Sequence, residues 1–96
     1  MQVRWLRKAI QNLNAEAECV AQENPTTAAE MFEYVKAKVD ALADFPAAGR
    51  AGRVPGTREL VIDHYPYLVP YRVAGDELHV LRVFHTRCKP PKTWWR

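Results

Sequence analysis

Apolar side chains in the first half of the chain recur every three or four residues, which is the spacing of one face of an α-helix. Val3 and Trp5 precede this region in an alternating pattern that predicts a short opening strand. A helix is predicted to follow, with the buried stripe Leu6, Ile10, Leu13, Ala17 and Val20.

A second helix is predicted to begin at Asn24-Pro25, because asparagine caps helix N-termini and proline is tolerated in the first turn. We expect it to run towards Phe45 and to end before Pro46, which cannot continue it. Its predicted buried stripe is Ala28, Phe32, Val35, Val39 and Leu42. A short connection joins the two helices, so they are expected to form an antiparallel hairpin.

The second half of the chain has the alternation and turn residues of a β-sheet. Pro70 lies inside one predicted strand and indicates either an edge position or a bulge. Gly75-Asp76 is the expected turn before the last strand. After a predicted loop over 46–56, the predicted strands are 57–63, 67–73 and 78–84.

These elements predict one α+β domain over residues 1–96, in the order β-α-α-β-β-β. The antiparallel two-helix hairpin is expected to pack on one face of a mainly antiparallel sheet. The opposite face is expected to be exposed and lined by some of the arginines, and function is expected there.

Charge is unevenly distributed along the chain. Residues 1–45 carry five Lys/Arg against seven Asp/Glu (−2), and residues 46–96 carry nine against four (+5). This asymmetry fits an acidic partner, either nucleic acid or an acidic protein segment, and it equally fits a solvated basic face. The loop spacing Gly49-Arg50-x-Gly52-Arg53 is a weak phosphate-site signal, because most such loops are plain connectors.

Several classes of protein are not indicated by the sequence. No apolar run approaches the roughly 20 residues that span a bilayer, and the N-terminus lacks the apolar core of a secretion signal. We therefore expect a cytoplasmic protein without a membrane partner. Cys19 and Cys88 lie far apart, so two free thiols are favoured over a disulfide. No metal-ligand spacing occurs, and neither a metal nor another cofactor is expected.

An extended tail is predicted at about 88–96, where Pro90-Pro91 disfavours a helix. Its tryptophans are costly to leave in water and are expected to dock on this protein or on a partner. Because the predicted core stripes all lie upstream, we expect the domain to fold without Lys89–Arg96 and the tail to act as a basic arm with an aromatic tip.

The ordered set of short motifs resembles the RelE/ParE superfamily, the toxins of bacterial type II toxin–antitoxin pairs. These motifs are Asn24-Pro25, Phe45-Pro-x-x-Gly-Arg50, Gly56-Thr-Arg-Glu-Leu60, Tyr71-Arg72-Val73 and Leu81-Arg-Val-Phe-His85. The resemblance implies a toxin that is neutralised by a cognate antitoxin, through an acidic or partly disordered segment.

Two mechanisms occur in this superfamily. RelE-like members cut mRNA on the ribosome, and ParE-like members poison DNA gyrase. The resemblance implies a candidate nuclease set of Arg58, Arg82, His85 and Arg87. Val61 and Leu68 occupy positions near which RelE-like members carry basic residues, and this favours the gyrase mechanism.

A third possibility, independent of the resemblance, is a small nucleic-acid-binding module whose basic sheet tracks phosphates. A histidine at a strand end, as at position 85, is more often a surface residue than a catalyst.

The candidate residues for binding the target or the antitoxin are Arg50, Arg53, Arg58, Arg72, Arg82, Arg87, Lys89, Trp94 and Trp95.

Overall fold

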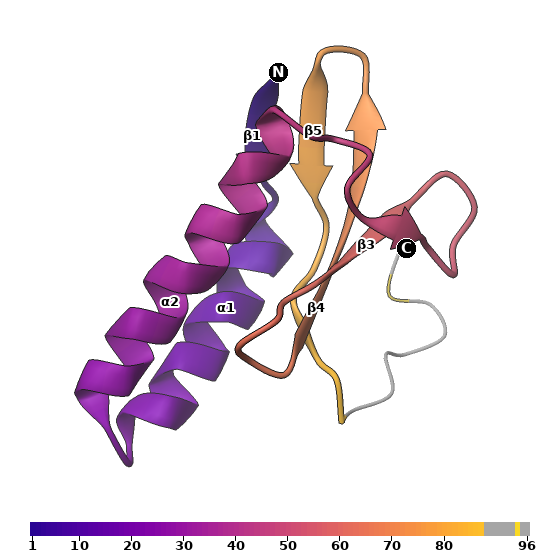
Figure 1. Ribbon diagram of the computed structural model, residues 1–96. Coiled ribbons are helices and arrows are strands. Elements are labelled where there is room, and N and C mark those ends of the chain that lie inside the picture. The colour runs from indigo at the N-terminus through magenta and orange to yellow at the C-terminus, as the bar shows by residue number, and fades with distance from the viewer. Residues whose placement is uncertain (88–93, 95–96) are drawn as a thin grey trace.

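Two helices lie side by side against one face of a twisted sheet in the computed structural model, which describes residues 1–87 and Trp94 (Figure 1). The elements are β1 (Gln2–Trp5), α1 (Arg7–Ala21), α2 (Pro25–Asp40), the 3₁₀ turn η1 (Ala41–Ala43), β2 (Arg50–Ala51), β3 (Arg58–Val61), β4 (Tyr67–Ala74), β5 (Glu77–Val80) and β6 (Phe84–His85). The predicted α+β class and helical hairpin are therefore confirmed. Two short strands, β2 and β6, were not predicted as separate elements.

The sheet has the strand order β1-β5-β4-β3-β2, and β6 pairs with the N-terminal end of β4. Strand β1 runs parallel to β5, while all the other pairs are antiparallel. The expected mainly antiparallel sheet is thus confirmed. The two-residue turn between β4 and β5 begins at Gly75, whose φ of 64° is a conformation that glycine adopts without strain.

The start of α2 follows the predicted capping chemistry. The Asn24 side chain accepts a hydrogen bond of 3.1 Å from the amide of Thr27, and Pro25 is the first helical residue. The predicted end at Phe45 is wrong, because α2 ends at Asp40 and tightens into the 3₁₀ turn. Phe45 is 69% exposed.

The predicted buried stripes are partly wrong, because each helix is rotated slightly from the expected orientation. Ala9 and Met31 are buried against the sheet, whereas Ile10 is 44% exposed and Phe32 is only partly buried. Leu13, Val35, Val39 and Leu42 lie in the core as predicted. The apolar residues of the hairpin therefore occupy two faces, and the sheet covers one of them.

Pro70 lies in the interior strand β4, so the edge prediction is wrong and the bulge prediction is confirmed. Two residues separate the paired positions Leu68 and Tyr71, while three residues, 81–83, separate their partners Phe84 and Val80. Proline has no amide hydrogen to donate to the ladder, and the extra residue of a bulge interrupts the ladder at this point.

The bulge changes which side chains of the last strand enter the core. The predicted alternation placed Arg82 on the same face as Val80, but Val83 takes that place and is 3% exposed. The Val83 amide donates a hydrogen bond of 3.1 Å to Oδ1 of Asn12 on α1. A side chain of the hairpin thereby satisfies a buried amide of the bulge.

Candidate functional site

The sheet face opposite the helices, called the open face below, is less exposed than predicted. Strand alternation places on it Arg4, Arg50, Glu59, Val61, Leu68, Arg72, Glu77 and His79. Glu59 is 4% exposed and Leu68 is 6% exposed, so the centre of this face is covered. Of the exposed arginines on this face, Arg4 and Arg50 lie on the edge strands β1 and β2, and Arg72 lies on the central strand β4.

Glu59 organises the chain between β2 and β3. Its Oε1 lies 3.3 Å from Nη2 of Arg50, and its Oε2 accepts a hydrogen bond of 3.1 Å from the amide of Arg53. In the segment whose spacing gave the weak phosphate-site signal, the Arg50 side chain and the Arg53 amide thus bind an internal carboxylate. Residues 50–51, predicted as loop, instead form strand β2 beside β3.

Arg58 does not lie on the open face. It pairs with Tyr71, whose side chain points to the helix-covered side, and its Nη1 donates to the carbonyl oxygen of Gly49 over 2.9 Å. The buried hydroxyl of Tyr71 accepts from the Gly49 amide (2.9 Å) and donates to the Pro46 carbonyl (2.7 Å). Arg58 therefore helps to fix the chain that precedes β2, and it is not one of the arginines on the open face.

Trp94 docks on its own domain, where it is 9% exposed. Its ring meets the Phe84 ring edge-on at 5.4 Å, and Cζ of Arg82 lies 5.9 Å from its centroid. Arg82 also donates hydrogen bonds of 2.6 Å to the carbonyl oxygens of Leu81 and Trp94. The expectation that all buried apolar side chains lie upstream of the tail is therefore wrong. Cys88, Lys89 and Trp95 lie outside the described residues.

A small hollow of about 190 Å³ opens beside β6. Its lining residues are Arg50, Arg53, Val61, Leu68, Phe84, His85 and Thr86. Nδ1 of His85 accepts a hydrogen bond of 3.1 Å from the amide of Arg87, and the His85 ring meets the Tyr67 ring edge-on. Burial, followed by the Glu16 carboxylate, raises the pKa of Tyr67 to about 12, so this phenol is not a base near neutral pH.

A larger cleft of about 610 Å³ lies between the start of α1, the loop before β3 and the bulge. We call it the cationic cleft, and it is lined by Leu6, Arg7, Lys8, Val54, Pro55, Gly56, Thr57, Arg72, Leu81, Arg82 and Trp94. Four of these described residues are cationic and none is acidic. The structure thus brings together Arg72 and Arg82, which the sequence singled out, with Arg7 and Lys8, which it did not.

Arg7 and Lys8 were not predicted as site residues, because they belong to the acidic half of the chain. One local signal does mark them, since both lie in the first turn of α1, which contains no acidic residue. Acidic side chains are the ones that stabilise the positive end of a helix dipole, so a basic pair there is unfavourable for the isolated helix.

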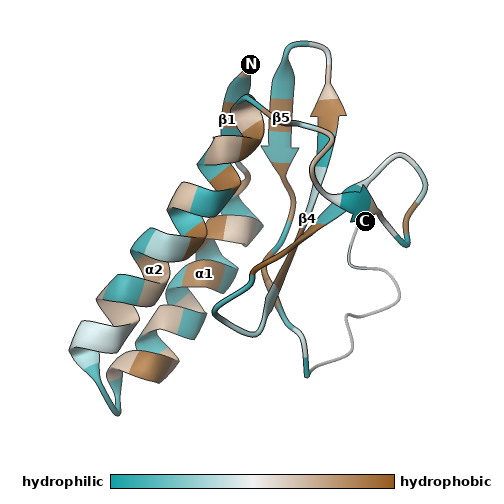
Figure 2. Cartoon of the chain, viewed as in Figure 1, coloured by the Kyte–Doolittle hydropathy of each residue, from teal (hydrophilic) through white to brown (hydrophobic). Residues whose placement is uncertain are grey.

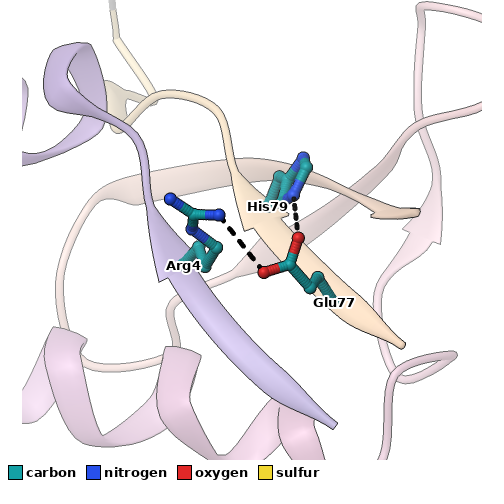
Figure 3. A network of polar contacts seen from close by, with 3 residues as sticks. All are labelled: Arg4, Glu77 and His79. Carbon is teal, nitrogen blue, oxygen red and sulfur yellow. Dashed lines mark hydrogen bonds and ion pairs between the residues drawn. The ribbon is translucent and has the colours of Figure 1, made fainter. Parts of the chain in front are cut away.

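A polar network on the open face joins β1 to β5. Figure 3 shows Arg4 of β1 and His79 of β5 both directed at the carboxylate of Glu77, with distances of 3.3 and 3.4 Å. The hydrogen bond from His79, and then Arg4, hold the pKa of Glu77 below its ordinary value of 4.5. The network fixes the orientation of these three side chains where β1 pairs in parallel with β5.

The outer surface of the helical hairpin carries exposed or partly exposed apolar side chains, among them Ile10, Ala29 and Phe32. A hollow of about 140 Å³ is lined by Trp5, Ile10, Leu13, Phe32 and Lys36. A neighbouring groove of about 390 Å³ runs between the helices and is lined by Asn14, Ala17, Glu18, Ala21, Ala28, Ala29, Phe32 and Glu33. Figure 2 shows the apolar stretches that interrupt the polar surface of both helices. We call these two features together the hairpin strip.

A protein-family model described as the ParE toxin of the type II toxin–antitoxin system parDE matches residues 3–90. The chain belongs to this family. It is therefore a toxin of a type II toxin–antitoxin system, and a cognate antitoxin is its partner.

Relatives and a solved structure agree with this assignment. Toxin Y4kP of Sinorhizobium fredii is 37% identical over 94% of this chain and 93% of its own length. Toxin RelE2 of Caulobacter vibrioides is 34% identical over 88% of this chain and 93% of its own length. A solved structure of the chromosomal ParDE system from P. aeruginosa superposes with a TM-score of 0.81 at 32% identity, covering 88% of this chain and 95% of that one.

In the described part of the toxin, neither helix combines the length and the apolar character that a bilayer crossing requires.

Proposed function

We propose that this toxin arrests growth in the cytoplasm by binding and poisoning DNA gyrase. The family match over residues 3–90 supports this, because gyrase is the target that the ParE-like resemblance implies. The names of relatives do not separate the two mechanisms, since one relative is called RelE2. The observation that carries the proposal is the separation of the candidate nuclease side chains.

Cleavage of RNA by its own 2′-hydroxyl requires a base, an acid and cations around one phosphate. Arg58 is bonded to the Gly49 carbonyl on the helix side of the sheet. Arg82 lines the cationic cleft, and His85 lines the small hollow. Three of the four candidate side chains are thus directed to three different places, an arrangement that suits a binding protein better than a nuclease.

The size and the lining of the small hollow also favour a binding protein over a nuclease. At about 190 Å³ it is smaller than the roughly 300–1,000 Å³ of ordinary ligand pockets. Val61 and Leu68 form part of its wall, where the nuclease mechanism would need basic groups. A ribosome-dependent nuclease is the second candidate function, because Arg53 and His85 line the same hollow.

Expression of the toxin without its antitoxin separates the two functions. A gyrase poison leaves broken DNA, so we expect the DNA-damage response and filamentation while protein synthesis continues at first. The His85→Ala variant should still kill. If translation instead stops within minutes, mRNA is cut at codon boundaries, DNA stays intact and His85→Ala is harmless, the nuclease is the correct function.

We further propose that the antitoxin lays an apolar helix along the hairpin strip. Ile10 is 44% exposed although it is large and apolar, and Phe32 lines both the hollow and the groove. The alanines at positions 17, 21, 28 and 29 have short side chains, which leave room for a partner helix to approach the groove closely. An apolar stripe at helical spacing is the form in which a partner segment fills such a groove.

A further inference from the structure

The cationic cleft is formed by chain segments that lie far apart in the sequence. Leu6–Lys8 come from the start of α1, Val54–Thr57 from the loop before β3, and Arg72 from the open face of β4. Arg82 and Trp94 close the remaining side. Its volume of about 610 Å³ lies within the roughly 300–1,000 Å³ that small-molecule sites occupy.

None of the four cations in the cleft forms an ion pair with a residue that the structure describes. Arg7, Lys8 and Arg72 are exposed and form no ion pair with any residue in 1–87 or with Trp94. By contrast, Arg4 and Arg50 are paired with Glu77 and Glu59. Like charges gathered around one cleft repel one another, and a bound anion relieves this repulsion.

The first turn of α1 adds to the positive potential. Its N-cap residue is Leu6, which has no side-chain acceptor for the first amides of this 15-residue helix. Helix N-termini favour negative charge, and backbone amides can act there beside the cations. Arg82 contributes its charge as well, although two of its N–H groups already donate to carbonyl oxygens.

Much of the remaining wall of the cleft is apolar. Leu6, Val54, Pro55 and Leu81 lie among the cations. A carboxylate carries one charge and two oxygens, whereas a terminal phosphate group offers more charge and three acceptor oxygens to several donors. A strand carries one charge on each phosphodiester, and its successive phosphates can meet several cations. A flat apolar base or sugar can pack against the uncharged wall while the phosphate meets the cations.

We propose that the cationic cleft binds the phosphate group of a nucleotide, either free or within a nucleic-acid strand. This site is separate from the small hollow where His85 and Val61 lie. Phosphate binding at the cleft is independent of whether gyrase is the target, and it is measured on the purified toxin alone.

The test uses the full chain freed from its antitoxin and four probes: sodium pyrophosphate, ATP, a single-stranded DNA of about ten nucleotides, and a Glu-rich peptide of similar charge. Affinity is measured by calorimetry and by fluorescence anisotropy at several salt concentrations. The cleft variants are Lys8→Gln and Arg72→Gln, each on an exposed side chain that forms no ion pair with a described residue. Lys38→Gln on α2 removes the same charge away from the cleft and is the matched control.

We expect the phosphate probes to bind and each cleft variant to weaken binding about tenfold, the loss of one charge-assisted contact. The Lys38→Gln variant should bind as the wild type does. If the single-stranded DNA binds far more tightly than ATP, the phosphate that the cleft recognises belongs to a nucleic acid. If the DNA and ATP bind with comparable affinities, it belongs to a free nucleotide. The proposal fails if the phosphate probes do not bind, if the peptide alone binds, or if Lys38→Gln weakens binding as much as the cleft variants do.

Discussion

Replacement of Trp94 by alanine tests whether the end of the chain is part of the folded domain. The side chain is 9% exposed and contacts the Phe84 ring and the Arg82 guanidinium. An arm that serves only a partner could be removed without loss of stability. A docked tryptophan could not, because its truncation exposes Phe84 and leaves Arg82 without its ring contact.

The magnitude follows from the buried area. A buried tryptophan hides up to about 250 Å², which at about 25 cal/mol per Å² corresponds to as much as 6 kcal/mol. This figure is an upper bound, because unfolded chains already bury some surface and because docking orders the chain around position 94. Tryptophan-to-alanine changes at buried sites cost about 3–5 kcal/mol. We expect about 3 kcal/mol for Trp94→Ala, since the residue lies near the chain end.

Urea unfolding followed by circular dichroism measures this loss on toxin separated from its antitoxin. A loss of about 3 kcal/mol corresponds to a drop in Tm of at least about 12 °C for a domain of this size. Trp94→Phe retains an aromatic ring and should lose less than half as much. Phe45→Ala is the control, because Phe45 is 69% exposed and its loss should change stability by less than about 0.5 kcal/mol. If Trp94→Ala unfolds at the wild-type midpoint, Trp94 does not stabilise the domain.

Three further outcomes are expected. Tyr71→Phe removes a buried hydroxyl that bridges two backbone groups, and should lower the free energy of unfolding by about 2–4 kcal/mol with an unchanged urea m-value; an unchanged midpoint would contradict the bridge. Ile10→Glu should weaken antitoxin binding at least tenfold in calorimetry, because it charges the hairpin strip; Phe45→Glu should not, and equal affinities for the two variants would exclude the strip. The hydrogen bond from His79 lowers the folded pKa of Glu77, so the stability that this carboxylate contributes is complete above its ordinary pKa of 4.5 and is lost as the pH falls through the lower folded value. Glu77→Gln should therefore flatten the acid side of the stability–pH curve measured by urea unfolding, and an unaltered curve would show that Glu77 does not contribute to it.

The sequence alone was sufficient for features that depend on neighbouring residues. The cap at Asn24-Pro25, the turn at Gly75-Asp76 and the existence of both helices follow from local hydrogen bonds, fixed φ angles and a helical period. The family was also evident, because its motifs follow one another in a fixed order along the chain. The bulge was one of two alternatives that Pro70 left open, and strand pairing decided between them.

Only the tertiary structure decided which surfaces face one another. A helical period states which residues share a face, but Ala9 and Met31, rather than Ile10 and Phe32, meet the sheet because of how the hairpin is rotated against it. A bulge shifts the alternation by one residue, and no local pattern reveals that Val83 then replaces Arg82 in the core.

The candidate sites depend on such long-range placement even more strongly. Arg58 is close in sequence to the other arginines and yet lies on the opposite side of the sheet. The cationic cleft gathers Lys8 from the acidic half of the chain with Arg72 and Arg82 from the basic half. A net charge counted over each half of the sequence does not show that residues from the two halves meet at one cleft. The electrostatic potential at a surface depends on distances through space, and the fold alone sets those distances.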